Sequence, residues 1–469
     1  MADELPKGRI ARGLALVKLA ARELPTVANR VMRDNAPPLD ALLVKESAER
    51  AVKVLGDLRG LAMKIGQTAS YVDGLLPPEA TEVYQKTLSK LQSQAPTVSF
   101  EEIRTEIERG LGRPLAEAFV RFDETPVAAA SIGQVHRAAI ADPDRPAGPP
   151  LEVAVKVQYP SIAQALHSDL KNLESLRPML AVLAPGADTR GGLEEVVKHI
   201  AAELDYTEEA RNQDLFRGLI ENIPGMMVPR VYHSHTAKNV LTMEFIEGRT
   251  VRAVAEQEGE AFRNKVGEAI FRFTLGLAFG RGVFNTDPHP GNYLVRDDAT
   301  VAFLDFGSVK VMPRALHAQW RTLATHLVEG QHEAWRALSS QLLGMEHMDP
   351  QVRKLHQDQM LQTAAMLSRD AAVCIDREML RDAVRGGIHN AKEIIKVAGW
   401  APSRSKTMNI PPDFVMVGRM QLGLFAVLAT LRPTNNWNQI LRDMLTRGLV
   451  PDAALAAKQD TVEPSPGEG

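Results

Sequence analysis

The chain has 469 residues, of which 45% are hydrophobic and 24% are charged, a composition that is ordinary for a globular protein of two or three domains. The formal net charge of -3 argues against a protein that coats nucleic acid. The single cysteine, Cys374, rules out a disulfide framework within the chain and suits a reducing compartment such as the cytoplasm.

The first predicted segment, residues 1–38, is basic and amphipathic. Its apolar residues recur at spacings of three and four, as on one face of a helix, and its basic residues lie off that face. An interfacial helix pairs an apolar face with a cationic flank, so peripheral membrane contact is one interpretation and packing on the protein's own core is the other. The apolar residues are Ile10, Leu14, Val17, Ala21 and Leu24, and the basic residues are Arg9, Arg12, Lys18 and Arg22.

Residues 39–117 are predicted to be helical, with helices at 39–70, 78–94 and 99–111. Glycine and proline residues separate these helices and end the last one. The last helix is amphipathic, which predicts that one of its faces is buried.

After residue 117 the pattern changes to short strand-like runs separated by turn residues. From residue 251 onward the chain is mostly helical apart from one hairpin, and the tail from residue 458 reads as disordered. A strand-rich part followed by a mainly helical part predicts a two-lobed α+β protein with its ligand cleft between the lobes. The expected strands are 119–122, 134–140, 151–158, 227–233 and 239–245, and the expected helices between them are 160–184 and 191–221.

No apolar run reaches the ~20 residues that a membrane-spanning helix needs. The nearest candidate, residues 414–431, contains Arg419 and Gln421. We therefore expect a buried helix there.

The hairpin expected at 292–304 carries the most informative motifs of the chain. Asp287 begins the segment Asp-Pro-His-Pro-Gly-Asn, Asn292 ends it, and Asp305 begins Asp-Phe-Gly thirteen residues later. Phosphoryl transfer needs such a set, with one Asp to accept or orient the attacking hydroxyl and an Asn and an Asp to hold magnesium on the nucleotide phosphates. Either motif alone can be a mere loop, but the pair in this order predicts a kinase-like site.

Lys156 lies in the run Val-Ala-Val-Lys-Val, which predicts a strand with one buried face. Its side chain leaves the opposite face, where it can meet the α- and β-phosphates of a nucleotide. The plainer interpretation is an edge-strand lysine that prevents aggregation. The order of the motifs favours the functional one. Such a lysine needs a carboxylate partner, and Glu209, in the acidic segment 203–212, is the predicted partner.

An alanine-rich turn at 128–130 stands where a kinase carries its glycine-rich phosphate loop. Alanine follows phosphates less freely than glycine, because positive φ angles cost it steric energy. The segment 242–248 ends a strand and is the candidate hinge for adenine. The residues predicted to contact the nucleotide are Ala128, Ala129, Ala130, Ser131, Gly133, Gln134, Val135, Lys156, Glu244 and Phe245.

Together these motifs resemble the AarF/UbiB family of atypical protein-kinase-like proteins, also called the aarF-domain-containing kinases. The resemblance spans roughly residues 40 to 440. It implies a kinase-like fold with a small β-rich N-lobe, a mainly helical C-lobe and a family-specific N-terminal helical extension that packs over the cleft. The motifs are Lys64-Ile65-Gly66-Gln67, 128–136, 153–156, Glu203-Leu204-Asp205, 287–292 and Asp305-Phe306-Gly307.

The resemblance also implies residue roles and a division into segments. The catalytic and ion-paired residues are Asp287, Lys156 and Glu209, the metal ligands are Asn292 and Asp305, and the residues of the inhibitory extension are Lys64, Gln67, Glu203 and Asp205. The segments are a basic amphipathic segment 1–38, a helical extension 39–117, a kinase-like N-lobe 118–247, a kinase-like C-lobe 248–457 and a disordered tail 458–469.

The leading hypothesis is an atypical kinase or ATPase that binds ATP or ADP with Mg²⁺ or Mn²⁺. The resemblance links it to ubiquinone or other isoprenoid-lipid metabolism. One alternative is a small-molecule phosphotransferase of the aminoglycoside or choline-kinase type, and another is a nucleotide-gated lipid-binding module with little turnover. The expected partners are a nucleotide, a lipid or quinone-precursor ligand and the inner face of a membrane, without nucleic acid. The expected location is the cytoplasm, with peripheral membrane contact.

Overall fold

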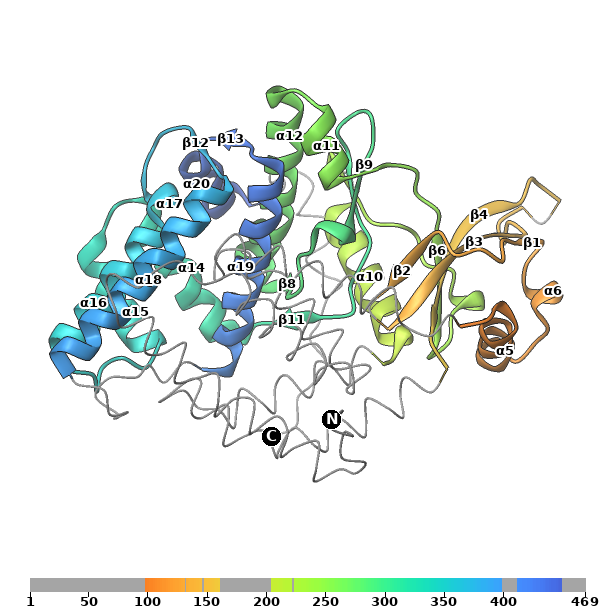
Figure 1. Cartoon of the computed structure of the whole chain (residues 1–469), viewed down its shortest axis with the longest axis horizontal. Coiled ribbons are helices and arrows are strands. Elements are labelled where there is room, and N and C mark those ends of the chain that lie inside the picture. The colour runs from red at the N-terminus through yellow and green to blue at the C-terminus, as the bar shows by residue number, and fades with distance from the viewer. Residues whose placement is uncertain are drawn as a thin grey trace, which may run out of the picture.

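The computed structural model of the protein describes residues 98–130, 132–145, 147–160, 204–221, 223–398 and 411–448. These residues form two lobes, a small one built on a sheet and a large one that is mainly helical (Figure 1). This is the two-lobed α+β arrangement that the sequence predicts. The interpretations that rest on 1–97, 161–203 and 449–469, including those for Lys64, Gln67 and Glu203, lie outside the described residues, as does that for Ser131.

The sheet of the small lobe has five antiparallel strands. They are β1 (Arg121–Phe122), β2 (Ala128–Ala130), β3 (Gly133–Ile140), β4 (Leu151–Gln158) and β6 (Val240–Glu244). Their order is β1-β3-β4-β6, with β2 paired to β3. Val153, Val155 and Val157 are fully buried on one face of β4, and Lys156 leaves the other face. The turn expected at Ala128–Ala130 is wrong. These three residues form strand β2, because their backbone pairs with β3.

Helix α5 (Phe100–Leu111) covers the outer face of this sheet. It begins at a serine–glutamate capping box, and its residues Ile103 and Ile107 are fully buried against the valines of β4. The short helix α6 (Leu115–Ala118) follows. The described part of the predicted extension, 98–117, thus packs on the back of the small lobe and not over the cleft, because its apolar stripe matches that face of the sheet.

Helix α10 (Tyr206–Ile220) connects the small lobe to the large lobe, since it contacts both β6 and β5 (Met226–Met227). Asp205, which we expected to belong to the inhibitory extension, caps this helix by accepting a hydrogen bond of 3.0 Å from the Thr207 N–H. The strand expected at 227–233 is wrong beyond its first residue. Pro229 lacks the N–H that a continued strand would donate.

The large lobe combines a four-stranded sheet, in the order β5-β10-β9-β7, with a layer of helices. Its hairpin β9–β10 is the one expected at 292–304. The further strands are β7 (Arg249–Thr250), β8 (Val283–Asn285), β9 (Tyr293–Val295), β10 (Val301–Phe303), β11 (Val309–Val311), β12 (Val373–Cys374) and β13 (Thr434–Asn435). The helices are α11 (Val251–Gln257), α12 (Glu260–Phe271), α13 (Leu277–Arg281), α14 (Arg314–Val328), α15 (His332–Leu342), α16 (Pro350–Thr363), α17 (Ala365–Ser368), α18 (Arg377–Ala398), α19 (Pro412–Leu431) and α20 (Trp437–Arg447).

A π-helical turn, Arg272–Gly276, lies between α12 and α13. Its Thr274 hydroxyl donates to the carbonyl of Ile270 at 2.9 Å. Its Phe273 ring stacks on Phe303 of β10, with ring centroids 3.5 Å apart. The turn therefore packs against the β9–β10 hairpin, and π-turns of this kind often lie at functional sites.

Helix α19 is the helix expected at 414–431. Among the described residues it alone, over Asp413–Leu431, is long and apolar enough to cross a bilayer by length and composition, and 56% of this stretch is buried inside the protein. Met416, Met420 and Leu424 are almost completely buried in the core of the large lobe. This burial agrees with the expected core helix.

The first residue of β3 is expected to be intolerant of any side chain. A Cβ at Gly133 would lie 2.0 Å from the Val157 carbonyl oxygen on β4, so Gly133→Ala should separate the two strands. We expect a loss of about 1–3 kcal/mol in the free energy of unfolding, measured by urea denaturation. Gly218→Ala on α10 is the control, because a Cβ there meets nothing within 4 Å. Equal stability of the two variants would contradict this account of Gly133.

Candidate active site

A buried ion-pair network joins the two lobes. Lys156 Nζ lies 2.7 Å from Glu209 Oε1 and 3.0 Å from Glu209 Oε2. It also lies 3.2 Å from Asp305 Oδ2 in the large lobe. Strand β4, helix α10 and the loop after β10 each contribute one of these three residues. The lysine therefore connects three separate elements through one ammonium group.

The electrostatics of this network keep the lysine charged. Burial disfavours the ammonium, but the carboxylates of Asp305 and Glu209 outweigh that effect and hold the pKa of Lys156 well above its usual range. Burial raises the pKa of Glu209 to about 7, an effect that Lys156 opposes and Asp305 reinforces. One cation thus faces two carboxylates. A second cation beside Asp305 would relieve this imbalance.

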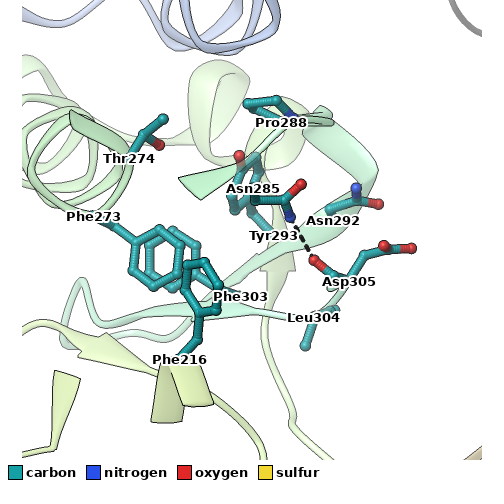
Figure 2. Close-up of a pocket in the computed structure, with 10 residues that line it drawn as sticks. All are labelled: Phe216, Phe273, Thr274, Asn285, Pro288, Asn292, Tyr293, Phe303, Leu304 and Asp305. Carbon is teal, nitrogen blue, oxygen red and sulfur yellow. Dashed lines mark hydrogen bonds between the residues drawn. The ribbon is translucent and has the colours of Figure 1, made fainter. Parts of the chain in front are cut away.

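The loop that follows β8 holds Asp287 in a fixed place. Asn285 Oδ1 accepts a hydrogen bond of 2.8 Å from the Asp287 N–H, and Asn285 Nδ2 donates to the Asp305 carbonyl at 2.6 Å. Figure 2 shows this second bond as a dashed line. Asn292 Nδ2 donates to the Asp287 carbonyl at 3.2 Å. The two asparagines therefore tie Asp287 to the loop that carries Asp305.

His289 caps the short 3₁₀ turn Pro290–Asn292, because its Nδ1 accepts a hydrogen bond of 3.0 Å from the Gly291 N–H. Burial lowers the pKa of His289, which favours the neutral ring that can accept this bond. The turn presents Asn292 beside the hairpin. His289 therefore stabilises the backbone of the Asp287–Asn292 motif.

Aromatic packing anchors the loop after β10 to helix α10. Phe306 is fully buried, with its ring centroid 5.0 Å from that of Phe216 on α10. Asn212, also on α10, donates to the Phe306 carbonyl at 3.1 Å. In Figure 2 the rings of Phe216, Phe273 and Phe303 gather on one side, and Asn292 and Asp305 point away from them. The loop is therefore docked with the Asp305 carboxylate directed out of the core.

A cavity of about 700 Å³ lies between the lobes and is bordered by this network. A volume of this size is typical of small-molecule and cofactor sites. The residues from the small lobe and α10 that line it are Val127, Ala128, Ala129, Ala130, Ile132, Val135, Arg137, Ala154, Lys156, Tyr206 and Glu209. The remaining lining residues are Met243 to Gly248, Thr250, Asp287, His289, Gly291, Asn292, Leu294, Leu304, Asp305 and Gly307.

Most of the predicted nucleotide contacts border this cavity. Among the described ones, Gly133 and Gln134 do not. Side chains alternate across a strand, so Val135 faces the cavity while Gln134 points to the opposite face, where its Nε2 lies 2.8 Å from His136 Nε2. Gly133 serves the close approach of β3 and β4. Alternate residues of the segment therefore border the cavity, as the strand periodicity requires, and nucleotide contact by these residues stays a prediction.

Other cavity residues were missed by the sequence reasoning. Ala154 lies two residues before Lys156 on the same strand face, and Arg137 pairs with it across β3 and β4. The Arg137 guanidinium lies 4.5 Å from the ring centroid of Phe245. Leu294 lines the cavity from β9. The alternation around Lys156 was a usable signal for Ala154, whereas Arg137 needed the register of two strands.

Removal of the lysine from the network should destabilise the protein most at alkaline pH. In Lys156→Met the two carboxylates lose their cation, at a cost of about 3–5 kcal/mol in the free energy of unfolding at about pH 8. Burial raises the pKa of Glu209 and Lys156 lowers it, so this pKa should rise further in the variant. A carboxyl with a raised pKa destabilises the fold as the pH rises through that pKa, so the cost should shrink as the pH falls from about 8 and Glu209 is protonated. Urea denaturation across this range measures it. Lys238→Met, at an exposed lysine, is the control, and a cost that is independent of pH would contradict the prediction.

Comparison with known proteins relates this chain to atypical kinases. Residues 90–339 match the ABC1 atypical kinase-like domain family. AarF domain-containing protein kinase 1 of Xenopus laevis is 32% identical over 310 residues, which cover 65% of this chain and 57% of that protein. The mitochondrial atypical kinase COQ8 of Saccharomyces cerevisiae is 28% identical over 396 residues, which cover 82% of this chain and 77% of that protein.

A solved structure has the same fold. Rv3197 of Mycobacterium tuberculosis, in complex with erythromycin, superposes with a TM-score of 0.59 at 27% identity and covers 88% of this chain and 97% of its own. The chain spans about half the length of the AarF domain-containing relatives of frog, chicken and mouse. The match to the family nevertheless extends over more than half of this chain. The chain therefore belongs to the ABC1/AarF family of atypical kinase-like proteins, and it has the kinase-like α+β fold that its motifs imply.

Proposed function

We propose that the protein is an atypical kinase or ATPase that binds a magnesium nucleotide between its lobes and transfers or hydrolyses the terminal phosphoryl group. The contact of Lys156 with both Glu209 and Asp305 is the observation that carries the proposal. Kinases need the strand lysine held by a helix glutamate, beside the aspartate that binds metal. A network that serves stability alone has no need to border a cavity of about 700 Å³.

The donor chemistry of the site fits Mg²⁺ or Mn²⁺. Asn292 and Asp305 offer oxygen atoms, the ligands that such hard cations prefer. Among the described residues no group of three or more histidine, cysteine, aspartate or glutamate residues forms a metal cage. This agrees with a cation held by one or two side chains together with nucleotide phosphates. When bound, the cation would neutralise charge on those phosphates.

Each protein group then has a role that follows from its position. Lys156 would contact the α- and β-phosphates, with Glu209 fixing its ammonium. Asp287 would orient the attacking oxygen and accept its proton. The N–H groups of Glu244 and Phe245 are bonded to the carbonyls of Arg230 and Glu152. The adenine edge is therefore expected to meet the hinge groups that follow, at 246–248.

The motif resemblance, which implies a link to isoprenoid-lipid metabolism, is the support for a lipid-related role. The yeast relative and the zebrafish COQ8B relative are named as mitochondrial atypical kinases. We propose that this protein serves ubiquinone or another isoprenoid-lipid pathway, from the cytoplasm with peripheral membrane contact. Purified protein should then turn over nucleotide faster with liposomes and a quinone-precursor mimic. Equal rates with and without these additions would contradict the lipid link while leaving the kinase proposal intact.

A small-molecule acceptor is the second candidate, and the erythromycin complex of Rv3197 favours it. That protein shows that the shared fold can take a large ligand other than a nucleotide. Calorimetric titration of erythromycin into this protein, with and without nucleotide, distinguishes the candidates. Binding only in the presence of nucleotide would favour a small-molecule acceptor.

Substitution of the two aspartates should separate binding from turnover. Asp305→Asn should strongly weaken metal-dependent nucleotide binding, because it removes a charged metal ligand. Asp287→Asn should spare binding and abolish turnover, because it removes the base. Calorimetry with Mg-nucleotide and release of labelled phosphate measure the two quantities.

Asp297→Asn is the matched control for both aspartates. Its side chain lies in the turn of the same hairpin and is 97% exposed. Unaltered Mg-nucleotide affinity in Asp305→Asn would remove the metal assignment, and full turnover in Asp287→Asn would remove the base.

A further inference from the structure

Helix α19, from the C-terminal part of the described chain, contacts the loop that carries Asp287. Arg419 Nη2 lies 3.1 Å from Asp287 Oδ1, and both side chains are mostly buried, with exposures of 23% and 19%. One turn further along α19, Gly423 packs on Pro288, the residue after Asp287. Near the start of the helix, Asp413 pairs at 2.8 Å with Lys310, which lies on the strand that pairs with β8. The helix is thus attached to the catalytic loop and to its neighbouring strand.

This attachment lies outside the part of the chain that defines the family. The family match ends at residue 339, well before α19 begins at Pro412. The cation that pairs with Asp287 is therefore not part of the motif that contains Asp287. A helix from the C-terminal part of the described chain supplies it.

The position of Arg419 favours a role in supporting Asp287 over direct contact with the nucleotide. Asp287 lines the cavity between the lobes, whereas Arg419 is absent from the described residues that line it. Arg419 therefore contacts the Asp287 carboxylate from outside the cavity. The Nη2 group is close enough for an ion pair but is not aligned as a hydrogen bond to any described group. Catalytic contacts are often poorly aligned without ligand and tighten in the reactive complex.

We propose that Arg419 is a positioning residue for the reaction: its guanidinium holds the Asp287 carboxylate toward the attacking oxygen. This inference rests on the proposed phosphoryl transfer. The loop fixes the backbone of Asp287 through Asn285 and Asn292. Arg419 acts on the side chain. A guanidinium has the planar, permanently charged geometry that suits a carboxylate, and lysine lacks its fork.

Gly423 gives the proposal a second, steric test. A Cβ there would lie 2.6 Å from the Pro288 carbonyl oxygen, so any side chain must move α19 away from the loop. Gly418 lies one turn and a half earlier on the exposed side of the same helix, and a Cβ there meets nothing within 4 Å. Both Gly→Ala changes gain the same helix preference. They differ in whether they disturb the contact with the catalytic loop.

The experiment measures nucleotide turnover and Mg-nucleotide affinity in the full-length protein. Arg419→Gln should lower kcat by a factor on the order of 10² with an unchanged KM, because a misplaced catalytic group costs about that much. Arg419→Lys should recover part of the loss, since it keeps the charge without the fork. Gly423→Ala should lower kcat in the same way, and Gly418→Ala should match the wild type.

The outcomes separate this inference from the proposed function. A wild-type protein without any nucleotide turnover would overturn the proposed function and the positioning role together. Wild-type turnover with an unchanged or raised kcat in Arg419→Gln would overturn the positioning role alone. So would a loss that appears in KM and leaves kcat intact. If Gly423→Ala does not fold, the Gln and Lys variants of Arg419 still decide the question.

Discussion

The contact of one buried ammonium with two carboxylates organises this protein. Lys156 comes from the central strand of the small lobe, Glu209 from the connecting helix and Asp305 from the hairpin of the large lobe. Their contacts bridge the two lobes at the border of the cavity between them. Removal of Lys156 leaves two carboxylates without their cation, which costs more than the loss of a surface pair. The cavity is thus defined by electrostatics as much as by packing.

The sequence predicted the parts of this site whose chemistry is local. An Asp, an Asn and a second Asp around a short hairpin are recognisable because strand and turn residues alternate visibly there. Lys156 is recognisable because its strand has valine on every other position. The family membership and the two-lobed fold were also predictable, since the order of these motifs restricts the possible arrangements. The assignment of catalytic and metal-binding roles stays a prediction.

The sequence could not predict what depends on distant packing. Helix α5 was assigned to a cover over the cleft, but its isoleucines match the valines behind the sheet, and amphipathicity alone does not say which surface is matched. Gln134 was grouped with Val135 because the two are neighbours, although a strand sends them to opposite faces. Arg419 was noted only as a charge in an apolar helix. Its pairing with Asp287 depends on how the last helices fold back on the first part of the lobe.

The π-helical turn Arg272–Gly276 sets the rotational phase of the elements that follow it. A π-turn holds one residue more than an α-turn, so it rotates everything after it by about 100° relative to a continuous α-helix. Helix α13, strand β8 and the Asp287 loop all follow this turn. A variant that lacks the extra residue would therefore present α13 and the residues after it in a different rotational phase. Insertions and deletions in this helix are therefore far less neutral than those in the surface loops, and alignments of distant relatives should allow their gap at this turn.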